Sequence, residues 1–450
     1  MRRFVAVLAV VASLHQLGGA TRAAAEFQVL TEGKIAFFEN RGDPAQNGGI
    51  IVVGRDRALR TLYDPTCPAT SAVEIEAYLQ STVRDAVLAH VDLDCAKWTR
   101  VGRGYAYADP TGSVRAIRYT RSGLQLEVRG PDSTPISGPV GYLQAQLAIG
   151  DDILRARFHN FRRNDAAVVR SRRPSLAASR GEAGFWDALL GDDSSEAREQ
   201  EAIGLLETAV RRTPRDGRSH FLLGMLHLYR FGQRVVRFET ISAEARAELA
   251  AANVSFATAV PLLWDDANAS GDSRVPGFAA AAKYLQGVVE DDGSLRDAGL
   301  AELDRSIEIN SFFNVFDYIP VMQFLPPSDP LFQKGFALFT TYLEDPETLG
   351  CVGTQQEICA NAGLAPHNIQ GALTLFGDLY AKGGDVDRAQ MWYNLASVFP
   401  DTLTWNFAAL LADRKANAAA RVALYADADL GNDPPIIGAG PEACAVCHNR

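Results

Sequence analysis

The spacing of apolar and polar residues changes part way along the chain. Between residues 26 and 165 apolar side chains tend to alternate with polar ones, as in AVEIEAYLQ (72–80) and VRAIRYT (114–120). A period of two places alternate side chains on one face of a strand, and turn sequences such as DPTG (109–112) separate the runs. The pattern predicts an N-terminal all-β sandwich or barrel over residues 26–165. Residues 81–93 (STVRDAVLAHVDL) fit either a helix or a strand.

After the predicted strands the apolar period lengthens to three or four residues. Residues 166–196 are rich in Ser, Arg, Gly and acidic residues, which is typical of a linker, and the apolar run FWDALL (185–190) within them is suited to docking on a neighbour. From residue 197 to residue 429 the spacing predicts an all-α domain. The fold class predicted from the sequence is therefore multidomain, with a β domain before a helical domain.

Small and large residues recur at fixed offsets in the helical part. Ala202, Leu206 and Ala209 are followed by Pro214, and the run LTLFGDLYAKGGDVDRAQMWYNLASVFP (373–400) carries the same pattern across two helices. This pattern resembles the tetratricopeptide repeat, a helix–turn–helix unit of about 34 residues. The resemblance implies a solenoid of stacked helix pairs, whose curved surface binds a peptide or a protein. It implies no catalysis.

The first 25 residues have the features of a signal peptide. Arg2 and Arg3 precede an apolar run that is too short to span a bilayer, and small residues before Glu26 offer a cleavage site. We therefore expect an exported protein, periplasmic or extracellular in a bacterium, without a membrane span. Without residues 1–25 the chain has 41 basic and 54 acidic residues. This net negative charge argues against a nucleic-acid partner.

Six cysteines remain in the exported chain, an even number that favours pairing. Their spacing suggests two structural disulfides, Cys67–Cys95 and Cys351–Cys359, although other connectivities are open. The remaining two, Cys444 and Cys447, belong to a terminal motif.

Residues 430–450 are rich in Pro and Gly, which predicts a tether that ends in CAVCHNR (444–450). The Cys-x-x-Cys-His sequence resembles the haem-attachment motif of c-type cytochromes. By that resemblance, Cys444 and Cys447 would bind the vinyl groups of one covalent haem c, and His448 would be the proximal iron ligand. Only two residues follow the motif, so no cytochrome c domain can follow it.

The sixth ligand of the iron would come from an earlier residue, from a partner, or be absent. His367 is the candidate distal ligand on this chain, and the alternative is a histidine at a helix start with a local hydrogen bond. A plain disulfide, a thiol-redox pair and a metal site such as zinc are the alternatives to haem for the terminal motif.

Three functions are consistent with these observations. The first is an exported c-type haem protein that transfers electrons with a protein partner docked on the helical-repeat surface. The second is a non-redox adaptor that binds a protein through its repeats and has a disulfide or metal-binding tail. The third is a haem enzyme that acts on a small molecule such as peroxide. The chain has no phosphate-binding loop, Gly-x-Ser-x-Gly elbow or His-Glu-x-x-His motif, so an electron-transfer or binding protein is favoured over an enzyme.

Overall fold

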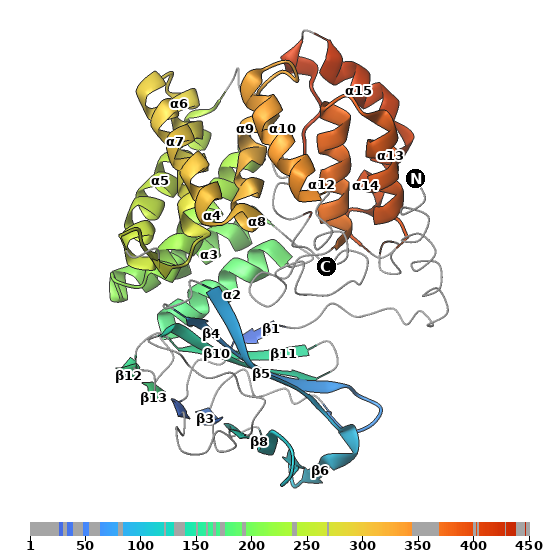
Figure 1. Cartoon of the computed structure of the whole chain (residues 1–450). Helices are drawn as coiled ribbons and strands as arrows, with labels where there is room; N and C mark the ends of the chain where they lie inside the picture. Colours follow the sequence, from blue (N-terminus) through green and yellow to red (C-terminus); the bar gives the residue numbers. More distant parts are fainter. Residues whose placement is uncertain are drawn as a thin grey trace.

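In a computed structural model of the chain, a β region precedes a helical region (Figure 1). The residues that the structure describes are 27–29, 34–38, 48–53, 64–79, 84–120, 123–129, 140–149, 152–158, 161–164, 168–171, 176–190, 195–235, 241–267, 270–343, 369–398, 402, 405–427, 429–437 and 446. The order of the two regions is the one predicted from the change in hydrophobic spacing. The predicted signal peptide lies outside the described residues.

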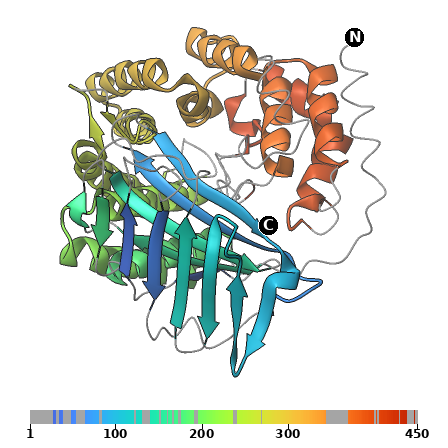
Figure 2. The same ribbon diagram turned by 60° about the horizontal axis from the view of Figure 1, so that its bottom comes forward.

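The described strands of the β region form two sheets (Figure 2). The first has the strand order β1 (Phe27–Val29), β11 (Asp152–Phe158), β10 (Val140–Ile149), β4 (Ser71–Leu79), β5 (Arg84–Leu93). The second has the order β12 (Phe161–Asn164), β13 (Val168–Ser171), β2 (Lys34–Phe38), β3 (Gly48–Val53), β9 (Gly123–Arg129), β8 (Val114–Thr120), β7 (Gly104–Ala108), β6 (Trp98–Val101). Neighbouring strands run antiparallel, except that β1 and β11 are parallel. Residues 81–93, which fitted a helix or a strand, contain the edge strand β5.

The alternation of apolar and polar residues in β8 matches its burial. Val114, Ile117 and Tyr119 are buried, whereas Arg118 between the last two is exposed. The register shifts between Val114 and Ala116, where a bulge adds one residue to the strand. The bulge explains why the first two buried positions are three residues apart and not two.

The helical region begins with α2, and a single group of contacting buried apolar residues extends from Phe185 on α2 to Val446. Its helices are α2 (Leu176–Leu190), α3 (Glu196–Arg212), α4 (Gly217–Arg234), α5 (Ala243–Leu263), α6 (Val275–Val289), α7 (Gly293–Ile309), α8 (Ser311–Asn314), α9 (Ile319–Gln323), α10 (Pro330–Leu343), α12 (Ile369–Lys382), α13 (Val386–Ala396), α14 (Ala408–Ala416) and α15 (Ala418–Ala426). The described residues of the whole chain also form short 3-10 turns, namely η3 (Cys95–Lys97), η5 (Val315–Tyr318) and η8 (Leu430–Asn432). In the helical region, a two-stranded ladder joins β14 (Trp264–Asp265) to β15 (Ser270–Gly271).

Consecutive helices pack in pairs, α2 on α3, α4 on α5, α6 on α7 and α12 on α13 (Figure 1). Glycines allow close approach within these pairs, as Gly224, Gly299 and Gly377 show. A Cβ atom on Gly224 would lie 2.8 Å from the Phe256 ring, one on Gly299 would lie 2.5 Å from the Tyr284 backbone nitrogen, and one on Gly377 would lie 2.3 Å from the Tyr393 ring. These distances are too short for any larger residue without movement of the helices.

Residues 166–196 do not form the linker that we predicted, because they contain β13 and the whole of α2. Gly181 and Gly184 let α2 approach α3 closely, since a Cβ atom on either would lie 2.9 Å from a leucine side chain of α3. Phe185 and Trp186 of the FWDALL run are buried in the helical core, as its apolar character indicated. Small residues that suggested a flexible linker are here used for packing.

Candidate functional site

Most residues of the predicted site lie outside the described part of the chain. This is true of Cys444, Cys447 and His448, of the candidate ligand His367, and of the Cys351–Cys359 pair. The described residues do include Val446, between the two terminal cysteines, and residues 429–437, which lead toward the motif. These two segments locate the C-terminal part of the chain.

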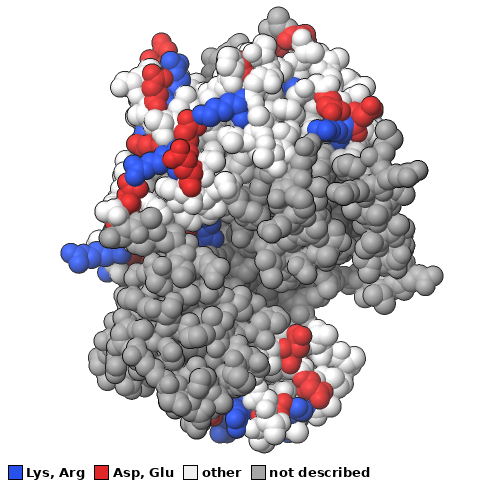
Figure 3. Space-filling view, in the orientation of Figure 1, with Lys and Arg blue, Asp and Glu red and all other residues white. Residues whose placement is uncertain are grey.

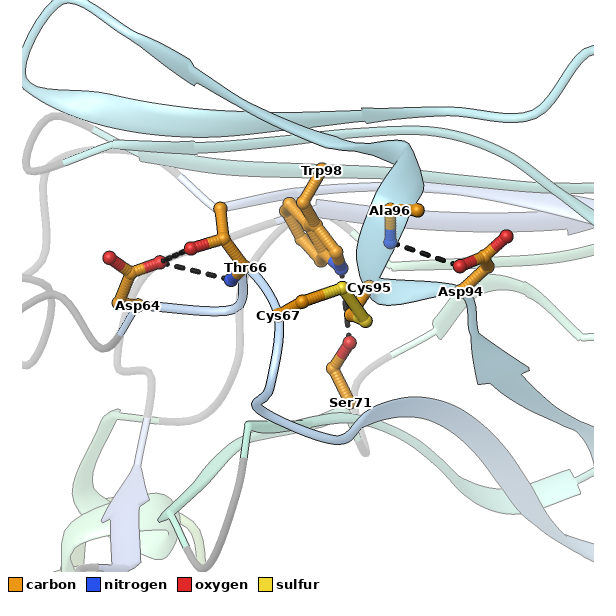
Figure 4. The surroundings of a disulfide bond; sticks show 8 residues. All are labelled: Asp64, Thr66, Cys67, Ser71, Asp94, Cys95, Ala96 and Trp98. Atoms are coloured by element: carbon orange, nitrogen blue, oxygen red, sulfur yellow. Dashed lines mark hydrogen bonds between the residues drawn. A yellow bond between two sulfur atoms is a disulfide. The ribbon is translucent and has the colours of Figure 1, made fainter.

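The structure contains the predicted Cys67–Cys95 disulfide, with Cα atoms 5.0 Å apart (Figure 4). Cys67 precedes β4 of the first sheet, and Cys95 precedes β6 of the second. Next to the disulfide, the Trp98 indole N–H donates a buried hydrogen bond to the Ser71 hydroxyl at 3.0 Å. Cys95 also follows β5, which pairs with β4 in the first sheet, so the disulfide joins segments 28 residues apart beside a buried contact. This position is suited to the structural role that we expected.

Residues 433–437 (Asp-Pro-Pro-Ile-Ile) are held by buried side chains of the helical region and do not form the free tether that we predicted. The side chains of Ile436 and Ile437 belong to the helical core. We call the surrounding polar side chains the C-terminal clamp: Gln323, Asp378, Lys382, Arg414, Arg421 and Tyr425. The prolines suggested a tether because they exclude a helix, but an extended segment can also be a buried one.

The clamp donates hydrogen bonds to the backbone carbonyls of the two prolines. The Tyr425 hydroxyl donates to the Pro434 carbonyl at 2.8 Å. The Arg421 and Arg414 guanidinium groups donate to the Pro435 carbonyl at 3.1 and 3.4 Å. Carbonyl groups that leave water need such donors, since an unpaired buried carbonyl destabilises the fold.

The two isoleucines present N–H groups, and the clamp supplies an acceptor for each. The Ile436 N–H donates to the Gln323 side-chain carbonyl at 2.6 Å, and the Ile437 N–H donates to Asp378 at 3.1 Å. Proline has no N–H, so residues 434 and 435 bring no donor that would need a partner. The sequence Pro-Pro-Ile-Ile thus matches the donors and acceptors that surround it.

Asp378, on α12, is completely buried and connects three other helices to the tail. One of its oxygens accepts from the Tyr393 hydroxyl at 2.7 Å, from Arg414 at 3.1 Å and from Arg421 at 3.2 Å. The other accepts the N–H of Ile437. A buried carboxylate is stable only when it is paired in this way. Burial opposes the charge of Arg421, but the neighbouring Asp378 carboxylate raises the pKa of this guanidinium above its usual value.

Lys382 lies one turn after Asp378, and its side chain is also completely buried. Its ammonium donates to the Gln323 backbone carbonyl at 2.7 Å and pairs with Asp433 at 3.1 Å. The same ammonium lies 5.4 Å from the centre of the Tyr425 ring, within reach of a cation–π interaction. Burial lowers the pKa of Lys382 and raises the pKa of Asp433, while their mutual attraction opposes both shifts. The Lys382–Asp433 pair therefore fixes the start of the segment formed by residues 433–437.

Val446 is a second point of attachment for the tail. It is helical, its exposed fraction is 0 %, and it belongs to the same apolar core as α12–α15. Eight residues separate it from Ile437. Positions on both sides of Cys444 are therefore buried against the helical region.

Three buried N–H groups of this part of the molecule have no hydrogen-bond acceptor within the described structure. They are the indole N–H groups of Trp392 and Trp405 and the Nε–H of Arg421. An unpaired buried donor costs about 1–3 kcal/mol.

The described histidines of α4 have structural partners. His220 Nε2 lies 3.1 Å from the Pro214 carbonyl, and His227 Nδ1 lies 2.6 Å from the Glu248 carboxylate. Met322 is fully buried in the core. Within the described residues, no three His, Cys, Asp or Glu side chains are grouped so that they could hold a metal ion.

Sequence analysis did not identify the clamp. One signal was present: Asp378 and Lys382 interrupt the otherwise apolar run ALTLFGDLYAK (372–382) at positions four apart, which lie on one helix face. Charged residues on the apolar face of a buried helix are rarely left unpaired. The signal indicates buried ionic partners, but it does not say which residues these are.

The face of the molecule drawn in Figure 3 has acidic and basic side chains next to one another over the described helices. Ion pairs of the described helical region include Lys283 with Glu302 and Arg305 with Asp266. No helix of the described structure combines the length and apolar character needed to cross a membrane. Comparison with protein families, with curated proteins and with solved structures finds no match to this chain.

Proposed function

We propose that this protein is an exported c-type haem protein that transfers electrons with a protein partner docked on its helical region. Cys444 and Cys447 would carry one covalent haem c, and His448 would bind its iron. The haem supplies one-electron chemistry, while the chain positions it and controls the access of water. The observation that carries the proposal is the burial of Val446 between the two cysteines.

The burial of Val446 matters because it shows that a residue within the motif packs in the apolar core and is not exposed to solvent. In a helical turn, residues three apart lie on one side, so helical Val446 is compatible with two cysteines facing one porphyrin edge. A plain disulfide would not account for the histidine that follows the second cysteine.

The helical region would serve as a tetratricopeptide-like scaffold. The pairing of α2 with α3, α4 with α5, α6 with α7 and α12 with α13 supports this proposal, because each repeat contributes one such pair. The buried small positions, such as Ala202, Ala209, Ala389 and Ala396, are those at which the repeat packs its helices. A partner on the scaffold would be held near the haem, which raises the effective concentration of one near the other.

The test is a pyridine haemochrome spectrum of the denatured protein, purified from a host that matures c-type cytochromes. We expect one covalent haem per chain in the native sequence and none when Cys444→Ala and Cys447→Ala are combined. The double variant should also lose reduction of any partner that the native protein reduces. His448→Ala should retain covalent haem but alter the iron spectrum in the reduced protein.

The same measurements separate the two other functions. Absence of haem from the native chain would overturn the proposal and would favour a repeat-based adaptor with a paired or metal-binding tail. Covalent haem with one open axial position and turnover of peroxide would instead favour the haem enzyme.

A further inference from the structure

The C-terminal clamp holds residues 433–437 more firmly than an ordinary connection requires. The N–H bonds of both isoleucines are buried, and the Lys382–Asp433 pair and the hydrogen bonds to both prolines are part-buried. The partners come from α9, α12, α14 and α15. A segment bound at each residue by four helices cannot swing as a flexible tether does.

The second attachment, at Val446, lies within the motif itself. His448 follows it by two residues, and Cys444 precedes it by two. The eight residues between Ile437 and Val446 are therefore fixed at both ends. The three buried cations near the tail, Lys382, Arg414 and Arg421, pair with Asp378 and Asp433, and Arg414 also pairs with Asp413.

We propose that the C-terminal clamp positions the Cys-x-x-Cys-His motif, so that the haem is fixed against the α12–α15 helices and does not move on a mobile arm. This inference rests on the proposed function. Tyr425, Asp378 and Arg421 are positioning residues, because they act through the tail and not on the haem. The electron-transfer partner must then approach the haem on the helical region, since the haem does not travel to the partner.

The test loosens the clamp at a single hydroxyl group in the haem-loaded full chain. Tyr425→Phe removes the hydroxyl, which donates to the Pro434 carbonyl and accepts from the Arg421 guanidinium, and keeps the ring. Tyr318→Phe is the matched control: this buried tyrosine donates to Asp304 on α7, away from the tail. Amide hydrogen exchange of peptides that cover residues 438–450 and the haem reduction potential are measured in both variants, with haem content as the internal check.

If the clamp positions the motif, Tyr425→Phe should accelerate exchange across 438–450 about fivefold, while Tyr318→Phe leaves it unchanged. The potential of Tyr425→Phe should also become more negative, because water reaching a loosened haem stabilises the more charged ferric form. The same exchange rate and potential in both variants, with one haem per chain, would overturn the inference and leave the proposed function intact. A native chain without haem overturns both.

Asp378→Asn is a second variant that weakens the clamp more strongly, and circular dichroism shows whether it folds. If Asp378→Asn folds, binds haem and keeps the native rate of amide hydrogen exchange over residues 438–450, the clamp does not position the motif. Faster exchange than in Tyr425→Phe would support the inference that the clamp positions the motif.

Discussion

At the scale of single residues, Asp317 is a buried carboxyl group whose ionised form the fold does not stabilise. This carboxyl lies in η5 and is buried, and one of its oxygens has no hydrogen-bond partner among the described residues. It lies over Gly277, where a Cβ atom would be 2.1 Å from the same oxygen, and next to the Asn314 amide, whose oxygen is also unpaired. Burial raises the pKa of Asp317 well above its usual value. Over the pH range between the two pKa values, the folded protein binds a proton at Asp317 that the unfolded chain has released.

Asp317→Asn should stabilise the protein increasingly as the pH rises. Because folding raises the pKa of Asp317, its protonated form contributes its full stability only below the pKa of the unfolded chain, near 4. Above that pH the contribution falls by about 1.4 kcal/mol per pH unit until the folded carboxyl ionises. Asparagine keeps the shape and carries no titrating proton. The free energy of unfolding, measured in urea between pH 5 and pH 8, should diverge between the two proteins. Parallel curves would mean that Asp317 is not protonated in the folded state.

At the scale of elements, the approach of α12 to α13 depends on Gly377. Gly377→Ala should lower the free energy of unfolding by about 1–3 kcal/mol, because the new methyl group overlaps the Tyr393 ring. Gly204 on α3 is the matched control, since a Cβ atom there meets nothing within 4 Å. Gly204→Ala should raise stability by about 0.5–1 kcal/mol, because alanine is the better helix former. Denaturant unfolding measures both, and equal effects of the two substitutions would contradict the close packing.

The elements were largely predictable from the sequence, and the clamp was not. Alternation predicted β8, and the small and large spacing of Ala202, Leu206 and Ala209 predicted positions that are all buried in α3. These signals are local, within a few residues. The glycines of α2 misled us, because a small residue is equally suited to a loop and to close helix packing. The signal peptide, the Cys351–Cys359 pair and the haem ligands stay predictions.

Asp378 shows why the clamp could not be predicted. Its partners Arg414, Arg421 and Ile437 lie 36, 43 and 59 residues further along the chain. No periodicity relates such positions, because they meet only when α12, α14, α15 and the tail are already packed. The sequence showed that a charge interrupts an apolar run, but only the fold identifies what neutralises it.

At the scale of the whole molecule, the tail is an integral part of the helical core. A chain that ends at Asn432 leaves the Lys382 ammonium buried without Asp433, and it uncovers the core surface under Ile436 and Ile437. Loss of one partner of a buried ion pair costs about 3–5 kcal/mol. For a region of this size we expect a fall in melting temperature of about 10 °C or more.

A chain that ends at Ala443 keeps the whole clamp and loses only Val446 among the described buried residues. Burial of one valine contributes about 1.5–3 kcal/mol, so this chain should melt several degrees above the shorter one. Both chains lack the terminal motif, so neither can bind haem there, and the difference between them depends on residues 433–443. Equal melting temperatures would mean that residues 433–437 lie on the core without stabilising it. Among the described residues, Val446 would then be the one that joins the motif to the helices, and the proposed positioning of the motif by the clamp would lose its support.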